Sequence, residues 1–395
     1  MSPFGFPRRP GSLAVGLALV LLVALAGPGV VSRLQVPPAV RTITVGRAPT
    51  AVAVDERTQH VFVANLGSNT VSMLDAASRK VLATIAVAPH PNTLAVATTA
   101  GRVFVVSDDV TLDDAGRVSV LDASSGRLLR TVAVGRGEHA LAVDERTGRV
   151  FVTNAADASV SVLDARSGRL LRASPLGLIP TGIVVDERTD RVFLLSGAPW
   201  THAYPTTVSL LDAWSGTVLR TVAVGTSADA LAVDERTGMA FVSDSHDKVV
   251  LMLDGHTAAV VRTAAMQLTP GALAVDERTG DIVVANAYDN SVSLVDAASG
   301  HVVRTVPLAL PPRAIAVDQR RDRVVVLTSE AFVPAALAGQ VQVLEGRTGR
   351  LLHTVAVGAD ASALALDEHT GKVFATAMNV YHLPAGADNT GWLRA

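Results

Sequence analysis

Apolar and polar positions alternate along this chain in short runs, and the same order of runs returns at a regular interval. From Val40 onward, segments resembling "ALAVD" end at positions spaced 42 to 49 residues apart. Those positions are Asp55, Ala97, Asp144, Asp186, Asp234, Asp276, Asp318 and Asp367. A period of this size indicates an array of similar structural units.

Each unit contains four apolar runs of strand length. Examples are "ALAVD" (140–144), "RVFVTN" (149–154), "SVSVLDA" (159–165) and "LLRTVAVG" (128–135), and turn residues separate them. Val, Ile, Phe and Thr dominate these runs and no helical period appears, so the runs predict strands. Four antiparallel strands per unit are typical of one blade of a β-propeller. We therefore predict an all-β fold with a single propeller over residues 40–395, and an open solenoid of strands is the alternative.

The inventory of strands predicts eight blades, with seven as the alternative. The first outer-type strand, "VRTITVG" (40–46), precedes every inner strand and has no blade of its own. The last unit lacks a clear third strand, which "TGWLRA" (390–395) can supply after a long loop. We expect the N-terminal strand to complete this last blade, because closure of the ring removes exposed sheet edges.

A polar motif, "VDERTG", follows the first strand of most units and raises the question of a charged site. It occurs at 143–148, 233–238 and 275–280, and close variants stand in other units. Asp accepts hydrogen bonds from the backbone that follows it, and Gly tolerates a positive φ, so the motif predicts a tight turn. We expect its Glu and Arg side chains to be solvated and weakly paired.

The N-terminal segment differs from the rest of the chain. Arg8 and Arg9 precede a continuous apolar stretch from Leu13 to Ala26. A positive segment followed by an apolar one is typical of an export signal, so residues 1–31 are predicted to be a signal peptide or an uncleaved signal anchor. Residues 32–39 form a proline-containing linker. Positive charge before the apolar stretch predicts an extracytoplasmic propeller that is secreted, periplasmic or on the cell surface.

Composition excludes several classes of site. The chain has 395 residues, no Cys, and 34 basic against 36 acidic side chains. Thiolate metal sites, disulfides and a Cys nucleophile are therefore excluded. The near-neutral charge disfavours a nucleic-acid partner, and membrane contact is expected only through the N-terminal segment.

The repeated segments "RVFVTN", "VSVLDARSG" and "RTVAVG" resemble the YVTN-repeat β-propellers, which include the YncE-like proteins. The resemblance covers nearly the whole chain after Val40. It implies a periplasmic or surface propeller that needs no cofactor. Some members of the family are described as DNA-binding, an implication that the near-neutral charge weakens here.

Alternating strand directions divide the connections between two rims. Turns between first and second strands and between third and fourth strands share the turn rim, where the sequence repeats. The other connections share the loop rim, where lengths vary, as expected of a binding surface on a rigid scaffold. Just before each first strand, the sequence predicts a polar ring at the central mouth of the loop rim. Its members are Thr50, Asn92, His139, Thr181, Asp229, Gly271, Arg313 and Ser362.

Long loops on the loop rim add further candidates. Aromatic and His residues, which are favoured at binding sites, are Trp200, His202, Tyr204, Tyr381 and His382. An acidic loop holds Asp108, Asp109, Asp113 and Asp114, which predict a solvated patch more readily than a calcium site. The His residues expected on this rim are His90, His139, His202, His246 and His382, and nothing in their spacing requires a metal.

No nucleophile elbow, phosphate loop or zinc-protease motif occurs in the chain, so catalysis is not supported. The sequence favours a monomeric, exported binding or interaction scaffold whose loop rim captures a small ligand, a glycan or a protein, without a cofactor or metal. A metal-assisted hydrolase or lyase, by analogy with enzymatic propellers, is the alternative. A DNA-binding YncE-like role is the least favoured.

Overall fold

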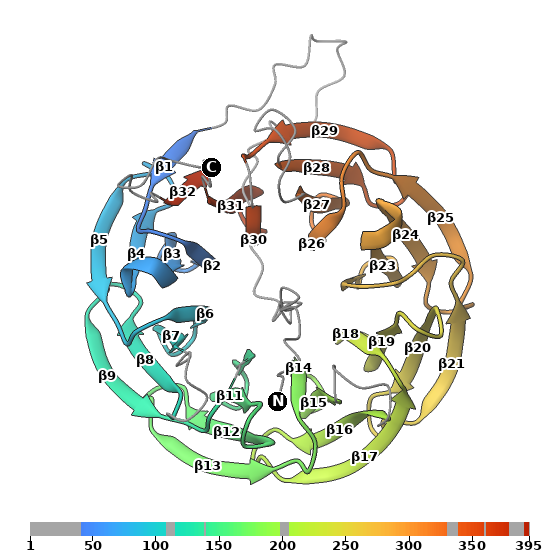
Figure 1. Cartoon of the computed structure of the whole chain (residues 1–395), viewed down its shortest axis with the longest axis horizontal. Helices are drawn as coiled ribbons and strands as arrows, with labels where there is room; N and C mark the ends of the chain where they lie inside the picture. The colour runs from blue at the N-terminus through green and yellow to red at the C-terminus, as the bar shows by residue number, and fades with distance from the viewer. Residues whose placement is uncertain are drawn as a thin grey trace, which may run out of the picture.

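The structure is a computed structural model that describes residues 41–107, 115–137, 140–197, 205–329, 339–358, 361–378 and 391–394. Its strands form eight four-stranded antiparallel sheets arranged in a ring, one for each copy of the repeat (Figure 1). The single propeller of four-stranded blades that the strand pattern predicts is therefore confirmed. The predicted signal or anchor (1–31) and linker (32–39) lie outside the described residues. No helix in the described ranges is long and apolar enough to cross a membrane.

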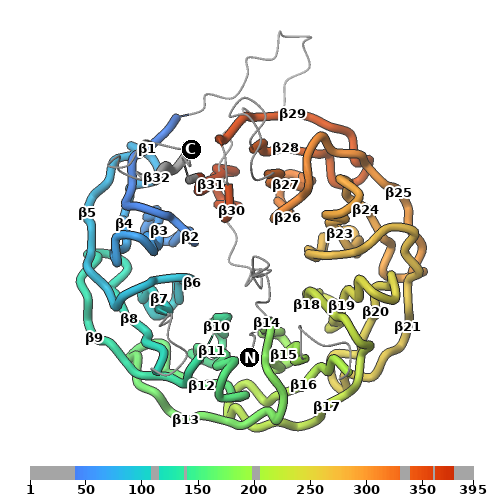
Figure 2. Tube along the Cα trace, in the orientation of Figure 1, coloured from blue at the N-terminus to red at the C-terminus, as the bar shows by residue number. Residues whose placement is uncertain are grey.

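In seven blades the strands run outward from the centre in chain order, whereas the remaining blade takes its outermost strand from the N-terminal end of the described chain (Figures 1 and 2). The innermost strands are β2 (Pro49–Asp55), β6 (Pro91–Ala97), β10 (Leu141–Asp144), β14 (Pro180–Asp186), β18 (Ala228–Asp234), β22 (Leu273–Asp276), β26 (Pro312–Asp318) and β30 (Ala361–Asp367). The second strands are β3 (His60–Asn65), β7 (Arg102–Ser107), β11 (Arg149–Asn154), β15 (Arg191–Ser196), β19 (Met239–Asp244), β23 (Asp281–Asn286), β27 (Arg323–Ser329) and β31 (Lys372–Met378).

The outer half of each blade follows the same order. The third strands are β4 (Thr70–Asp75), β8 (Arg117–Asp122), β12 (Ser159–Asp164), β16 (Thr206–Asp212), β20 (Val249–Asp254), β24 (Ser291–Asp296), β28 (Gly339–Glu345) and β32 (Gly391–Arg394). The outermost strands are β5 (Val81–Ala86), β9 (Leu128–Ala133), β13 (Leu170–Pro175), β17 (Val218–Gly225), β21 (Val260–Ala265), β25 (Val302–Pro307), β29 (Leu351–Ala356) and β1 (Thr42–Thr44). Blades are numbered 1 to 8 in the order of their innermost strands.

Both ends of the chain contribute to blade 8. Its sheet has the order β1-β32-β31-β30, and Ile43 of β1 pairs with Leu393 of β32. This is the ring closure that the unpaired N-terminal strand predicts. The closing blade packs against both neighbours, because one apolar cluster contains Ile43, Val61 of blade 1 and Val325 of blade 7.

The hydrophobic core lies between blades rather than inside one of them. Second strands that carry a Phe bury it completely, as at Phe62, Phe151 and Phe374. Phe62 packs with Leu94 of the next blade. Side chains on both faces of each sheet are thus covered by neighbouring sheets, which explains the near-continuous apolar second strands.

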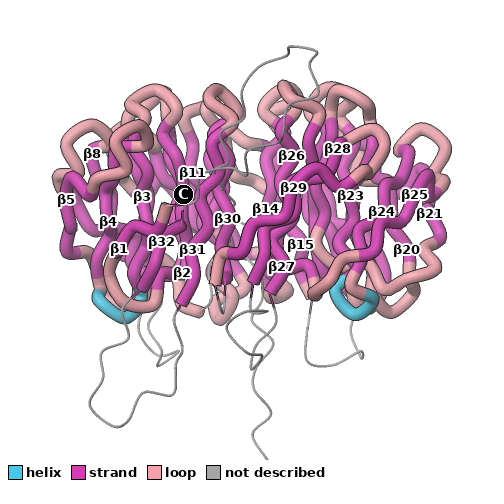
Figure 3. The backbone as a smooth tube through the Cα atoms, turned by 90° about the horizontal axis from the view of Figure 1, so that it is seen from above, coloured by secondary structure: helices cyan, strands magenta, loops and turns pink. Residues whose placement is uncertain are grey.

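The two rims differ as the strand directions predict. The short helices η1 (Leu66–Ser68) and η2 (Ala287–Asp289) connect second to third strands, and both lie on the same rim of the ring (Figure 3). This is the loop rim, and the repeated "DERTG" turns lie on the opposite rim.

Candidate functional site

The polar ring begins the innermost strands at the loop-rim end of the central channel. Its described members are Thr50 in β2, Asn92 in β6, Thr181 in β14, Asp229 in β18, Arg313 in β26 and Ser362 in β30. Gly271 precedes β22 at the equivalent place, and His139 lies outside the described residues. The structure therefore brings these segments to one mouth of the channel.

Two hydroxyl members of the ring join adjacent blades, whereas the Thr181 hydroxyl donates within its own blade, to the Leu195 carbonyl at 3.4 Å. The Thr50 hydroxyl donates a hydrogen bond to the carbonyl of Pro91 in the next blade, at 3.1 Å. The Ser362 hydroxyl donates to the carbonyl of Pro49, at 3.4 Å, across the junction between the last and first blades. These side chains have a structural use that requires no ligand.

Asp229 and Arg313 are the charged members described, and both side chains are exposed at the mouth. Oδ2 of Asp229 accepts a hydrogen bond from the Ser245 backbone at 3.0 Å, and Nε of Arg313 donates to the Ser329 carbonyl at 3.0 Å. Blade 6 lies between them and has Gly271 at the ring position. Each charged group is thus fixed on one side, with no side chain at the position between them.

A buried carboxylate supports the Asp229 region. Asp244 ends β19, where blades 1, 3 and 6 have Asn, and it is fully buried. Its Oδ2 accepts hydrogen bonds from the backbone of Thr226 and Ser227, each at 3.2 Å, and its Oδ1 accepts from His246 and Asp247, each at 2.9 Å. Although the Asp229 side chain is exposed, desolvation by the surrounding protein raises its pKa against hydrogen bonds from Ser245, and repulsion from Asp244 adds to the rise. Sequence reasoning missed Asp244, although an acid in place of the repeated Asn was a signal.

The remaining predicted loop-rim candidates are not placed by the structure. Trp200, His202, Tyr204, Tyr381, His382 and the four aspartates of the acidic loop lie outside the described residues. His90 and His246 are described. Within the described ranges, no group of three His, Asp or Glu side chains could hold a metal ion.

On the turn rim, the aspartates build turns as predicted. Oδ1 of Asp144 accepts a hydrogen bond from the Thr147 backbone at 2.8 Å. Gly148 closes that turn with φ 64°, and Gln59 has φ 57° at the equivalent place in blade 1. Asx hydrogen bonding and a left-handed residue together account for the repeated motif.

The expectation that the Glu and Arg side chains of these turns are solvated and weakly paired is right for the exposure of the Arg side chains, which are about half exposed, and wrong for their pairing. Glu187 accepts a hydrogen bond from the backbone of Glu145, in the preceding blade, at 2.8 Å. From the same turn as Glu145, Nε of Arg146 donates to the Glu187 carbonyl at 2.7 Å. We call this pair of bonds, which one turn donates to the Glu of the next turn, the turn clasp. It forms because the ring places consecutive turns side by side, which a single hairpin cannot reveal.

Turn clasps recur around the channel. Glu277 accepts from the Glu235 backbone at 3.1 Å, and Nε of Arg236 donates to the Glu277 carbonyl at 2.6 Å. Burial and repulsion from Glu187 and Glu277 raise the pKa of Glu235 to about 7. Burial also raises the pKa of Glu187. Crowded carboxylates thus make this end of the channel electronegative.

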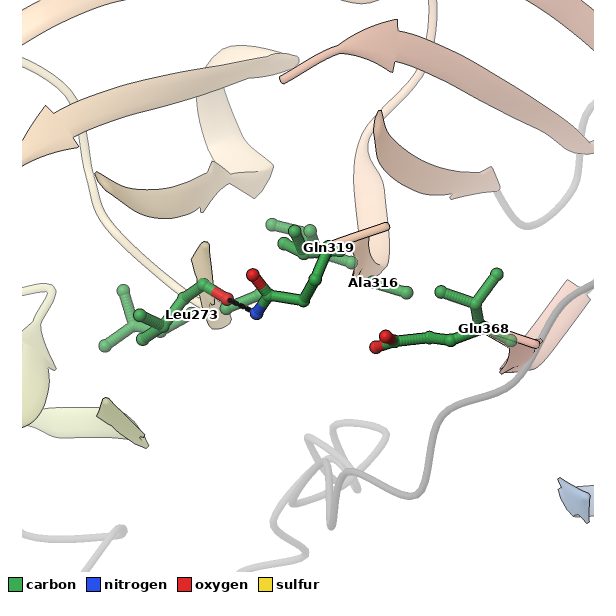
Figure 4. A pocket seen from close by; sticks show the side chains of 9 residues that line it. Leu273, Ala316, Gln319 and Glu368 are labelled. Atoms are coloured by element: carbon green, nitrogen blue, oxygen red, sulfur yellow. Dashed lines mark hydrogen bonds between the residues drawn. The ribbon is translucent and has the colours of Figure 1, made fainter. Parts of the chain in front are cut away.

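A hollow opens in the channel wall on the turn-rim side of blades 6, 7 and 8 (Figure 4). Its volume is about 350 Å³. Residues of β22, β26 and β30 line it, most of them with buried side chains, and Gln319 and Glu368 contribute polar groups. Both polar residues directly follow the Asp of a turn. They lie on the turn rim, where the repeated sequence predicted turns without a binding role.

Comparisons with known proteins address the fold. No protein-family profile matches the chain, and no curated protein sequence matches it. Among solved structures, it is similar to a chain of the Kuenenia stuttgartiensis hydrazine synthase. The TM-score is 0.58 at 13% sequence identity, over 79% of this chain and 98% of that chain. The likeness is one of fold.

Proposed function

We infer that this protein is a binding propeller that captures a small ligand at the loop-rim mouth of its channel. The observation that carries this inference is the arrangement of Asp229 and Arg313 around Gly271. Asp229 uses one carboxylate oxygen and Arg313 uses Nε for backbone contacts. The Ser245 side chain also donates a hydrogen bond to the Asp229 carboxylate, whereas the terminal guanidinium nitrogens of Arg313 make no hydrogen bond among the described residues. The remaining lone pairs of the carboxylate and these nitrogens can bind a ligand that carries both a cationic and an anionic group.

The sequence adds a cellular setting to this proposal. The repeats resemble the YVTN-repeat propellers, and Leu13 to Ala26 has the pattern of an export signal. We propose an extracytoplasmic member of that group, acting as a monomeric scaffold that binds its ligand outside the cytoplasm. The near-neutral charge of the chain supports a small or uncharged partner over DNA.

A thermal-shift screen of the full chain against amino acids and dipeptides tests the function. Binding to the folded state stabilises it by RT ln(1 + L/Kd) at a free ligand concentration L, so the melting temperature rises with ligand concentration and affinity. We expect D229N and R313Q each to lower the affinity for the stabilising compound by about tenfold or more, because each removes a charged hydrogen-bond partner. R127Q, which changes a turn-rim arginine, is the matched control. Equal stabilisation of all three variants would contradict this site.

A further inference from the structure

The exposed apolar side chains of this protein gather in one band. Among the described residues, every exposed large hydrophobic side chain except Tyr288 lies in a turn between a third and an outermost strand, or at the start of an outermost strand. These turns lie on the turn rim, so the band follows the outer edge of that rim. We call this surface the outer turn band. It comprises residues 75–83, 122–130, 164–172, 212–220, 254–262, 296–304 and 345–353.

The apolar part of the band recurs from blade to blade. The second residue of five outermost strands is a Leu or Val whose side chain is more than half exposed: Leu82, Leu171, Leu219, Val261 and Val303. Single exposed hydrophobic residues are ordinary on a protein surface, whereas a recurring exposed apolar surface marks an interaction site. The outer turn band is therefore a candidate for docking.

The band is also basic, although the chain as a whole is slightly acidic. It contains twelve Arg and Lys residues against seven Asp and Glu, whereas the whole chain has 34 against 36. Each acid belongs to a turn that uses it. Oδ1 of Asp164, for example, accepts hydrogen bonds from the backbone and the hydroxyl of Ser167, both at 2.7 Å. Arg166 and Arg169 of the same turn are exposed, so the band presents positive charge to its surroundings.

Trp214 combines the apolar and the basic character of the band. Its side chain is exposed, and the Arg149 guanidinium lies 5.7 Å from the centre of its ring. Arg172 of the preceding blade donates to the carbonyl of Ser215, the next residue, at 3.3 Å. Trp and Arg beside exposed aliphatic side chains are typical of the boundary between the headgroups and the hydrocarbon of a membrane.

The chain enters the propeller on the same rim. β1 is the outermost strand of blade 8, and Thr42 pairs with Arg394 at its turn-rim end. The residues that precede Thr42, including the apolar stretch from Leu13 to Ala26, therefore join the ring from the turn rim. Trp214 follows β16 in blade 4, across the ring from blade 8 (Figure 1). A membrane that holds the N-terminal segment would thus face the turn rim and could meet the band at Trp214 as well.

We propose that the outer turn band lies on a phospholipid surface that contains anionic lipids, with the loop rim facing away. Leu171, Leu219 and Trp214 enter the boundary between headgroups and acyl chains, and the exposed arginines contact the phosphates. This contact is additional to the one expected through the N-terminal segment. The mouth with Asp229 and Arg313 is on the opposite rim, so this proposal stands or falls independently of the ligand site proposed above.

Fluorescence from single labelled cysteines in the full chain tests the proposal. The chain has no Cys, so W214C and Y288C each carry one label, on the turn rim and on the loop rim. With vesicles of equal parts phosphatidylcholine and phosphatidylglycerol, we expect the emission of a polarity-sensitive label to shift to shorter wavelength at W214C and to stay unchanged at Y288C. L171C, on the neighbouring blade, should respond as W214C does. All three positions are exposed, and melting temperatures check that the variants fold.

Arginine variants separate the band from the N-terminal segment. In the L171C chain, R166Q with R169Q should lower the equilibrium constant for contact with these vesicles, read from the emission shift, by about tenfold or more. Two cationic side chains are then lost beside an anionic surface. R47Q with R136Q removes the same charge from the loop rim and should leave the constant within about twofold, because salt screens the more distant charges.

Four outcomes would overturn the proposal. Unchanged emission at both W214C and L171C would leave the N-terminal segment as the sole membrane contact. A shift at Y288C alone would place the loop rim on the membrane. Equal losses for the two pairs of arginine variants would remove the role of the band's charge. A shift at W214C that appears only when a protein or a nucleic acid is added would assign the band to that partner.

Discussion

Thr44, near the start of the folded chain, pairs with Trp392, near its end, in the register of β1 and β32. The last sheet is therefore built from both termini, and the two ends of the chain are joined by the backbone pairing of β1 with β32. Removal of residues 391–395 should destabilise the whole propeller, lowering the melting temperature by roughly 5–10 °C. Removal of residues 1–36 should leave it nearly unchanged. Calorimetry of both truncations checks this, and equal losses would contradict a closure by β1.

The Phe residues of the second strands are expected to dominate the packing between blades. Phe151 is fully buried in the cluster shared with Val192 and Leu194 of the next blade. F151A should cost about 3–5 kcal/mol of unfolding free energy, since it leaves a cavity between two sheets. Y288A is the control, because Tyr288 is 87% exposed, and it should change the free energy by less than about 0.5 kcal/mol. Urea denaturation measures both, and a comparable cost for the two variants would count against interblade packing.

Turn clasps should contribute measurably to stability. R236A removes the bond from Nε to the Glu277 carbonyl and the ion pair with Asp234 at 3.5 Å. Because the Arg236 side chain is half exposed, we expect a loss of about 1 kcal/mol. R220A, on an exposed outermost strand, should have almost no effect. If chemical denaturation gives the same free energy for the two variants, the clasp arginines are no better paired than surface arginines.

The crowded glutamates predict how stability depends on pH. Burial raises the pKa of Glu235 and of Glu368 to about 7 in the folded state. Between the ordinary glutamate pKa and this value, the folded protein binds more protons than the unfolded chain, so stability falls as pH rises from about 5 to about 7. Replacement of both residues by Gln should flatten this part of the curve. Melting temperatures measured between about pH 5 and pH 7 test this prediction. An unchanged slope in the double variant would show that other groups cause the pH dependence.

The outer turns titrate in a different window and provide a contrast. Hydrogen bonds from Ser124, opposed by burial, hold the pKa of Asp122 at about 2. Its stabilising contribution is present above the unfolded pKa and is lost only as pH falls toward 2. D122N should therefore leave the melting curve between pH 5 and pH 7 parallel to that of the wild type, and a changed slope there would contradict this assignment.

Chelation tests the expectation that no metal is needed. EDTA should leave the melting temperature within about 1 °C, because ligand loss shifts stability only where a ligand was bound. A clear drop would indicate a metal site that includes residues outside the described ranges, such as His139, His202 or His382. Metal analysis of the purified protein would then identify the ion.

The amino-acid sequence by itself determined the features that depend on near neighbours. The period of apolar runs defines the strands, and Asp144 with Gly148 defines a turn, because both rest on alternation and on backbone hydrogen bonds within a few residues. The surplus N-terminal strand even predicted its pairing with the C-terminal one. Tertiary structure alone decided that Arg146 and Glu187 join two blades. It also decided that Glu368 of blade 8 and Gln319 of blade 7 line the same hollow. Those contacts depend on how far each blade is rotated against the next, and side chains distant in sequence meet only once that rotation is fixed.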